Sequence, residues 1–398
     1  MAKTNCFHGA SNNCYPLFLI AGFSGWGRDE LGKFNYWGGF NDIEQLLNDK
    51  GFQTYTPALG PVSSNWDRAC ELFAIIKGGQ VDYGSAHARK HGHQRYGRSY
   101  PGLYPEWGEL NPHTGERNKI HIIGHSMGGQ TARLLVQLLH NGRPEEQKQT
   151  PSEELSTLFD NHKKPWVHSV TTISSPHNGS TLTAGITGVM PHAQHITAVV
   201  SALIGGMRHA FYDFKLDQWD LKKAQQESFR DYTNRIYKSG IWKFTKDLCS
   251  WDLSPEGASE LNSWVKAQPE VYYFSWATKN TFTAPYSCYE IPRSSMNPLF
   301  MPFSLQMGAY KRKAGHERLE IDERWWPNDG IVNTYSMDGP KLNSTDEIIG
   351  YTGKPVKGKW NYMGLLEPYD HMNIVGMRCP EILGWYVALA DLLCSLHV

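Results

Sequence analysis

A serine flanked by glycines is the strongest candidate for chemistry in this sequence. Residues 124–128 read Gly-His-Ser-Met-Gly, and they stand between the short apolar run 119–123 and a segment with helical periodicity that begins at Gln130. A serine in this strand–turn–helix context is typical of a nucleophile elbow, because the glycines let the backbone fold sharply and expose the hydroxyl. The other interpretation is a glycine-rich turn with an incidental serine. We expect Ser126 to attack a carbonyl carbon.

A serine hydroxyl needs a base that takes its proton and a third group that orients the base. After a nucleophile elbow, the expected chain order is serine, then an acidic residue, then histidine. Asp329 lies in an Asn-Asp-Gly turn, and His371 precedes the last expected helix. Asp-Gly is also a common turn dipeptide, most histidines in a chain that has 17 are structural, and Asp370 is another carboxylate beside His371. We expect Asp329 and His371 to complete the relay.

Acyl transfer also requires two N–H donors for the oxyanion. The start of the expected helix supplies one of them, the N–H of Met127. The second is expected from a loop after an early strand, and the glycine-rich stretch 22–27 fits that description. A plain glycine-rich loop is the alternative. We expect the N–H of Phe23 to be the second donor.

Apolar runs that alternate with helical patterns would position these residues. Continuous apolar runs favour buried parallel strands, and their alternation with helices favours a mostly parallel sheet covered on both faces. No repeat or low-complexity linker divides the chain, so we expect a single α/β domain over residues 1–398, with insertions. The expected strands are 16–23, 52–56, 120–123, 166–173 and 271–276, and the expected helices include 40–50 and 381–396.

The overall composition excludes several classes of protein. Apolar residues make up 40% and charged residues 20% of the chain, which is typical of a folded protein rather than a disordered one. Basic and acidic residues both number 39, which argues against nucleic acid as a partner. No apolar window is long enough to predict a transmembrane helix, and residues 1–13 show no signal peptide.

The cysteines are few and scattered. None of the seven forms a C-x-x-C pair, which argues against a cysteine-based metal site. Cys6 with Cys14, and Cys379 with Cys394, could close short loops in an oxidising compartment. The odd number leaves at least one free thiol.

Several further motifs resemble those of the large secreted true lipases of thermophilic Bacillus-type bacteria and staphylococci, and the resemblance covers nearly the whole chain. It implies a secreted protein with the α/β-hydrolase fold that hydrolyses carboxylic esters of long-chain acylglycerols, and it implies the roles given above for the five site residues. Ala21 stands where the family has histidine; because the neighbouring oxyanion donor is a backbone group, we expect this change to alter the edge of the site more than its chemistry. The motifs are Gly25-Trp26-Gly27-Arg28, Tyr36-Trp37-Gly38-Gly39, residues 60–71, Val81-Asp82-Tyr83-Gly84, residues 214–219 and residues 328–333.

The same resemblance implies a structural zinc site in an insertion over residues 63–107. Three histidines fall within residues 87–93, which by itself is a weak indication, since flexible loops often contain histidines without a ligand role. The resemblance leaves His91 as a bystander. Two imidazoles and two carboxylates fill a closed tetrahedron, which suits structural zinc. The ligands that the resemblance selects are Asp67, His87, His93 and Asp252.

Calcium is expected to be absent. In the family, acidic residues shortly after the catalytic histidine help to bind a calcium ion that steadies its loop. Asn373 and Arg378 stand at those positions here. Calcium needs several anionic or carbonyl oxygens, and an arginine adds a repelling charge. We therefore expect this site to be lost.

A helical lid is expected over residues 178–240. Within residues 181–211, apolar side chains recur at helical spacing, and Gly205-Gly206 would serve as a hinge. An amphipathic helix here would cover the apolar pocket in water and open at an oil surface, while a buried core helix fits the same periodicity. The resemblance favours a lid. The apolar positions are Ile196, Val199, Val200, Leu203, Met207 and Phe211.

These features predict a zinc-containing triacylglycerol lipase that acts on acylglycerols at a lipid–water interface through a serine acyl-enzyme. One alternative keeps the fold but restricts the substrates to short, soluble esters. Another is a catalytically inactive lipid-binding homologue, and the presence of all three expected triad residues counts against it.

Overall fold

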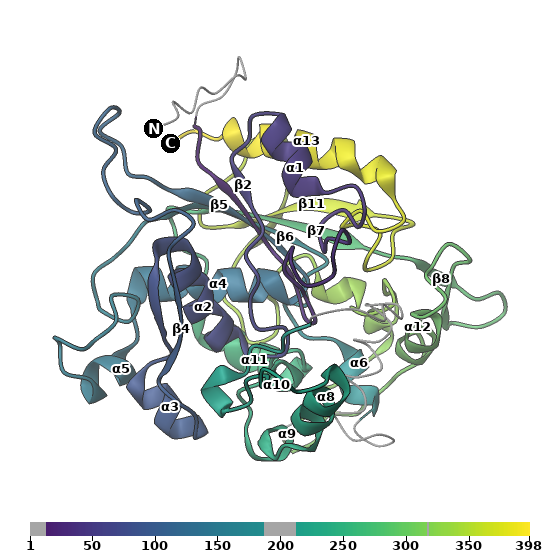
Figure 1. The fold of residues 1–398 in the computed structure, drawn as a ribbon. Helices are drawn as coiled ribbons and strands as arrows, with labels where there is room; N and C mark the ends of the chain where they lie inside the picture. Colours follow the sequence, from purple (N-terminus) through teal and green to yellow (C-terminus); the bar gives the residue numbers. More distant parts are fainter. Residues whose placement is uncertain (1–12, 187–211, 317) are drawn as a thin grey trace.

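A parallel β-sheet forms the centre of the structure, a computed structural model that describes residues 13–186, 212–316 and 318–398. Its strands lie in the order β10-β11-β7-β6-β5-β1-β2, and every pair of neighbours is parallel (Figure 1). The predicted α/β class is therefore confirmed. The strands of this sheet are β1 (Leu17–Ile20), β2 (Thr54–Tyr55), β5 (Ile120–His125), β6 (Val167–Ile173), β7 (Tyr272–Thr278), β10 (Ile348–Gly350) and β11 (Trp360–Leu366).

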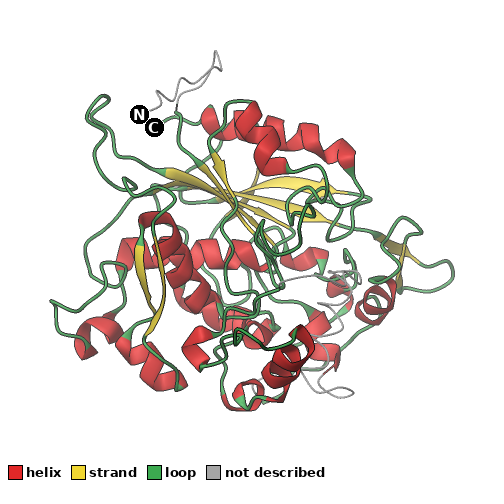
Figure 2. Ribbon diagram, viewed as in Figure 1, coloured by secondary structure: helices red, strands yellow, loops and turns green. Residues whose placement is uncertain are grey.

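Helices cover both faces of the sheet, as Figure 2 shows. On one face lie α1 and α13, which contact each other, and on the other lie α2 and α4. Shorter helices lie around and beyond the layer that α2 and α4 form. The helices are α1 (Ile43–Asp49), α2 (Asn65–Lys77), α3 (Ser85–His91), α4 (Met127–Asn141), α5 (Pro144–Gln149), α6 (Thr181–Ile186), α8 (Phe229–Lys238), α9 (Ile241–Phe244), α10 (Cys249–Asp252), α11 (Pro255–Trp264), α12 (Met301–Met307) and α13 (Leu383–Cys394).

Strand β1 shows why the sheet divides the core into two clusters. Successive side chains of a strand point to opposite faces. Leu17 and Leu19 accordingly pack with the α1 and α13 side chains, while Phe18 and Ile20 pack with those of α2 and α4. All four are fully buried, so the strand reads as a continuous apolar run rather than an alternating one.

Several strands and one register shift were not expected from the sequence. Strands β10 and β11 extend it beyond β7, and β11 carries a register shift between Tyr362 and Gly364. Outside the sheet there are two antiparallel pairs, β3 (Gly79–Asp82) with β4 (Tyr96–Tyr100), and β8 (Thr281–Thr283) with β9 (Glu290–Pro292). The β3–β4 pair lies within the predicted 63–107 insertion.

The suggested pairing of Cys379 with Cys394 is wrong, because both are buried free thiols. Each sits in the apolar cluster beside α13, where the side chain packs as a small apolar group. Cys14 is disulfide-bonded, and Cys6 lies outside the described residues.

Most of the predicted lid helix also lies outside the described residues, which omit 187–211. Its first turn coincides with α6, and α8 occupies part of the remaining 178–240 segment. Among the described residues, no helix is long and apolar enough to cross a membrane.

Helix α4 offers a test of the second core cluster. Leu135 is completely buried there, so Leu135→Ala removes buried apolar contacts and leaves a cavity; we expect it to lower the free energy of unfolding by about 2–5 kcal/mol. The matched change Leu305→Ala affects a side chain that is 50% exposed and should cost less than about 0.5 kcal/mol. Urea unfolding measures both, and equal losses would contradict this account of the core.

Candidate active site and metal cluster

Ser126 occupies a sharp turn between β5 and α4. Its backbone has φ 54° and ψ −132°, a region that residues with a side chain rarely adopt and that persists only when the surroundings hold it. The Ser126 N–H donates to the carbonyl oxygen of Ile173 in β6. A Cβ on Gly128 would lie 2.2 Å from the carbonyl oxygen of Ile20, so the first turn of α4 can pack against β1 only because Gly128 has none. This is the strand–turn–helix geometry of a nucleophile elbow.

Asp329 and His371 lie in direct contact. The Nδ1 atom of His371 is 2.7 Å from Oδ2 of Asp329, and the His371 N–H donates to the Asp329 carbonyl oxygen. Oδ1 of Asp329 accepts from the N–H groups of Ile331 and Val332, and Thr278, the last residue of β7, donates to Oδ2. Both site residues are buried. The carboxylate is thus fixed on the side of the imidazole that faces away from Nε2.

The ring of His371 also reaches the nucleophile turn. Its centroid is 4.6 Å from that of His125, the residue before Ser126. Ser126 follows β5, Thr278 ends β7 and His371 follows β11, so the three approach from the carboxyl ends of parallel strands. That edge is where ligands bind in open α/β sheets.

The two expected oxyanion donors belong to residues that adjoin Ser126 and Gly22 in the chain. Met127 is the first residue of α4, where an N–H has no acceptor within its own helix. Gly22, which precedes Phe23, approaches the nucleophile so closely that a Cβ on it would lie 3.0 Å from the Ser126 hydroxyl oxygen. Within the described residues, the Phe23 N–H meets no backbone acceptor. Both N–H groups therefore remain available beside Ser126.

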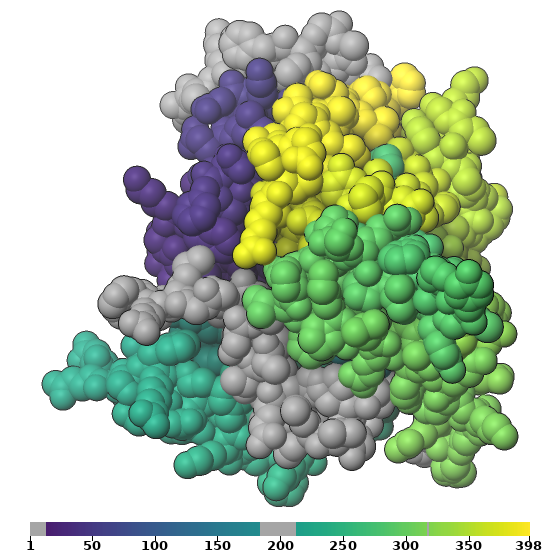
Figure 3. All heavy atoms as spheres, turned by 90° about the vertical axis from the view of Figure 1, so that its right-hand side faces the viewer, coloured from purple at the N-terminus to yellow at the C-terminus, as the bar shows by residue number. Residues whose placement is uncertain are grey.

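The loop that carries His371 is held by protein groups. Asp370 is buried, and its carboxylate accepts from the N–H groups of Asn297, Met372 and Asn373. Burial raises the pKa of Asp370 above its usual value, although these three donors oppose that effect. The carboxylate connects the loop to the 294–300 segment. Figure 3 shows the C-terminal segment in yellow beside a green region whose colour corresponds to residues near 300.

A cavity of about 830 Å³ lies where these segments meet the N-terminal region. Asn373 and Arg378, the two positions on which the prediction of a lost calcium site depends, both line it. Asp370, which lines the same cavity, is already occupied by the three backbone donors described above, and Arg378 adds a positive charge. These residues therefore do not fit a calcium ion.

Four buried or half-buried side chains form a potential metal site on the α2 side of the sheet. Their ligand atoms all lie within 4.8 Å of one another. Nε2 of His87 and Nε2 of His93 are each 3.1 Å from Oδ2 of Asp247, and His87 is 3.5 Å from Oδ1 of Asp67. The four residues are Asp67, His87, His93 and Asp247.

The donor set fits a cation such as zinc. Oδ1 of Asp67 and Nε2 of His93 are buried and, despite their ion-pair contacts with His87 and Asp247, make no hydrogen bond among the described residues; such atoms carry a cost unless a ligand satisfies them. Nδ1 of His93 lies 2.8 Å from the Gln94 carbonyl oxygen, which can only accept, so the neutral imidazole that binds a metal would carry its proton on Nδ1 and present the lone pair of Nε2. Asp67 is oriented by Gln218, which donates to Oδ2. Two imidazole nitrogens and two carboxylates match structural zinc.

The charges of this cluster also favour a cation. Burial disfavours a charged imidazole, but the Asp247 and Asp67 carboxylates outweigh burial and raise the pKa of His87 to about 9. Burial and the negative charge of Asp247 raise the pKa of Asp67. A bound cation would relieve the repulsion between the two carboxylates. His91 stands aside, with Nδ1 against the Thr245 hydroxyl.

Asp252 is not part of this cluster, which corrects the predicted ligand set. Its carboxylate accepts from the N–H of Asn65, the first residue of α2, and so satisfies a helix N-terminus instead. Asp247, five residues earlier, takes the fourth position. No local pattern indicates Asp247 as a ligand, because it lies in an unremarkable Thr-Lys-Asp-Leu stretch before α10.

The sheet and the serine turn define an α/β-hydrolase. A sequence profile of the family described as "Lipase-like, C-terminal domain" matches residues 13–394. The chain is 36% identical over 378 residues to Lipase 1 of Staphylococcus aureus (strain MRSA252), an alignment that covers 92% of this chain and 52% of that relative. The chain thus spans about half the length of the curated relatives it matches. It belongs to this lipase family.

Solved structures agree with this membership. EstA from Clostridium botulinum has a TM-score of 0.90 at 48% identity, covering 98% of this chain and 90% of that one. Lipase 1 from Pelosinus fermentans has a TM-score of 0.87 at 50% identity, covering 97% and 100%. Staphylococcus hyicus lipase has a TM-score of 0.79 at 30% identity and covers 97% of each chain. The predicted resemblance to the staphylococcal group is confirmed.

The corrected ligand set can be tested by metal analysis. Asp247→Asn removes an anionic ligand, so we expect the dialysed variant to lose its metal and its thermal unfolding to become insensitive to the chelator dipicolinate. Asp252→Asn keeps an oxygen that can accept from Asn65, so it should retain metal and respond to the chelator as the parent protein does. Elemental analysis and thermal unfolding measure both. Loss of metal from Asp252→Asn alone would restore the original assignment.

Proposed function

We propose that this chain is a secreted triacylglycerol lipase that hydrolyses carboxylic esters of acylglycerols at a lipid–water interface. The observation that carries the proposal is the 2.7 Å contact between His371 and Asp329 beside the strained backbone of Ser126. Membership of the lipase family supports the substrate class.

In the proposed reaction, Ser126 Oγ attacks the ester carbonyl carbon and Nε2 of His371 takes its proton. Asp329 holds Nδ1–H and balances the charge of the imidazolium, since its carboxylate already receives three other hydrogen bonds. The N–H groups of Phe23 and Met127 donate to the oxyanion. His371 then gives the proton to the departing alcohol, and water cleaves the acyl-enzyme by the same steps with the serine as leaving group.

Zinc is proposed as a structural ion held by Asp67, His87, His93 and Asp247. When bound, it would supply a fixed positive charge that cross-links α2, α3 and the segment before α10. Among the described residues, no contact joins these four ligands to Ser126 or His371.

Replacement of the nucleophile tests the reaction. We expect Ser126→Ala to lower the hydrolysis of a triacylglycerol emulsion by about 10³-fold or more, because no other group in the proposed relay forms the acyl-enzyme. An organophosphonate should label the parent protein and not the variant. Retained turnover in Ser126→Ala would contradict the assignment, and absence of labelling in the parent would favour an inactive homologue. Hydrolysis confined to short esters below their solubility limit would favour an esterase.

Calcium should have no effect on stability. Binding to the folded state alone would raise the unfolding temperature, and Arg378 with the occupied Asp370 offers no such site. We expect millimolar calcium to leave the thermal midpoint of the dialysed protein unchanged, whereas zinc should raise that of the metal-free form. A rise with calcium that Asp370→Asn abolishes would contradict this proposal.

A further inference from the structure

One peptide unit beside the nucleophile is held at both ends by buried side chains. The carbonyl oxygen of Ala21 accepts from Nη2 of Arg68 at 2.5 Å, and the N–H of Gly22 donates to the hydroxyl of Tyr36 at 3.0 Å. Ala21, Tyr36 and Arg68 are all buried. The next peptide unit carries the Phe23 N–H, the proposed oxyanion donor. The two units share the Cα atom of Gly22, so the orientation of the first peptide constrains the direction of that donor, together with the hydrogen bond that the Gly25 N–H donates to the Gly22 carbonyl oxygen.

Arg68 connects this peptide to the nucleophile helix. Its Nη1 donates to the Gly60 carbonyl oxygen and its Nε donates to the hydroxyl of Thr131 in α4. A guanidinium is planar and rigid, so three fixed acceptors leave it little freedom. Because it is charged, its bond to the Ala21 oxygen is stronger than a neutral one and polarises the peptide toward a better N–H donor.

Tyr36 has a fixed hydrogen-bonding direction. Its oxygen accepts from Gly22, so its one proton is available for Nδ1 of His125, 2.7 Å away. Burial raises the pKa of Tyr36 well above its usual value, which keeps that proton in place. Burial and the nearby His371 lower the pKa of His125 far below its usual value, so His125 is neutral with its proton on Nε2.

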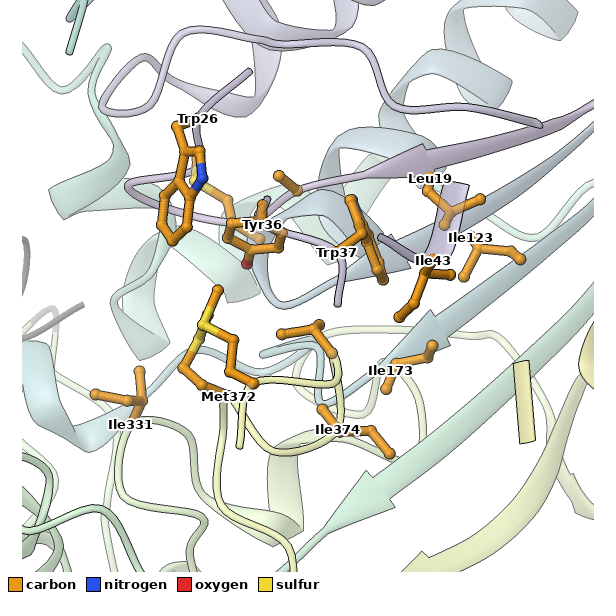
Figure 4. Packing of buried hydrophobic residues seen from close by; sticks show 14 of the residues in the cluster. Leu19, Trp26, Tyr36, Trp37, Ile43, Ile123, Ile173, Ile331, Met372 and Ile374 are labelled. Carbon is orange, nitrogen blue, oxygen red and sulfur yellow. The ribbon is translucent and has the colours of Figure 1, made fainter. Parts of the chain in front are cut away.

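Aromatic packing holds the phenol where this bond requires it. The Tyr36 ring lies 5.2 Å from that of Trp26 and 5.7 Å from that of Trp37, both edge-on. Figure 4 shows Tyr36 between these two tryptophans, with Met372 of the His371 loop across from them. Ring packing fixes the hydroxyl position independently of the hydrogen bonds.

We propose that Tyr36 and Arg68 are positioning residues for ester hydrolysis, which clamp the Ala21–Gly22 peptide so that the Phe23 N–H faces the oxyanion formed at Ser126. The inference rests on the proposed function. His125 completes the clamp by accepting the hydrogen bond from the Tyr36 hydroxyl. It does so as a neutral group, which spares the His371 imidazolium a neighbouring positive charge.

Removal of the Tyr36 hydroxyl tests the clamp. In Tyr36→Phe the Gly22 N–H loses its acceptor, and a displacement of the oxyanion donor should lower kcat by about 10–100-fold on a short soluble ester, with KM nearly unchanged. The affinity for a trifluoromethyl ketone, whose adduct places an oxyanion at this position, should fall by a similar factor. The stoichiometry of organophosphonate labelling at completion should stay the same.

Tyr273→Phe is a matched control. Tyr273 is equally buried, and its hydroxyl accepts from the backbone N–H of Gln268 at 2.9 Å, far along the chain from the nucleophile. Its loss should lower stability and leave kcat unchanged. If Tyr36→Phe behaves like Tyr273→Phe, or loses kcat without losing trifluoromethyl ketone affinity, the clamp is refuted. If Ser126→Ala retains turnover instead, the proposed function itself fails.

A second pair of variants covers the case in which Tyr36→Phe does not fold. In His125→Asn the amide oxygen is attached to Cγ, as Nδ1 is in histidine, so it can accept the Tyr36 proton. His125→Leu offers no acceptor. We expect the asparagine variant to lose less kcat than the leucine variant at equal KM. Equal losses would count against the clamp.

Discussion

The backbone of Ser126 departs from the conformations that residues with a side chain normally adopt, and the sheet supplies what keeps it there. Strand β6 accepts the Ser126 N–H, and β1 packs against Gly128 so closely that no side chain fits between them. The same approach brings the end of β1 beside the hydroxyl. A relaxed turn at Ser126 would therefore change the position of its hydroxyl, the helix start and the Gly22 loop together.

Buried polar groups are satisfied in different ways on the two sides of the sheet. Around His371 the two carboxylates are satisfied internally, because Asp329 and Asp370 each accept from backbone N–H groups nearby. Around His87 two carboxylates face two imidazoles, and atoms of Asp67 and His93 are left without partners among the described residues. The carboxylates around His371 obtain their hydrogen bonds from the folded chain itself. The cluster around His87 has the composition of a site that an ion completes.

The sequence predicted those parts that depend on local pattern or chain order. Apolar runs located β1, β5, β6 and β7, and the order of Ser126, Asp329 and His371 selected the residues that the fold brings to one edge. The sequence pattern did not predict β11, because this strand mixes apolar and polar residues and includes Gly364 at a register shift. It also selected Asp252 over Asp247, because which carboxylate meets His87 depends on how α10 packs against α2. Such a choice is set by tertiary packing, and no spacing rule encodes it.

Asp67 and Arg68 are consecutive residues of α2, and they serve two different centres. The carboxylate belongs to the metal cluster, and the guanidinium holds the Ala21 carbonyl oxygen. A single peptide bond thus links the two. If the cluster holds the proposed ion, a rotation of this helical turn on metal loss would tilt the guanidinium as well, so metal binding would be coupled to the proposed oxyanion geometry.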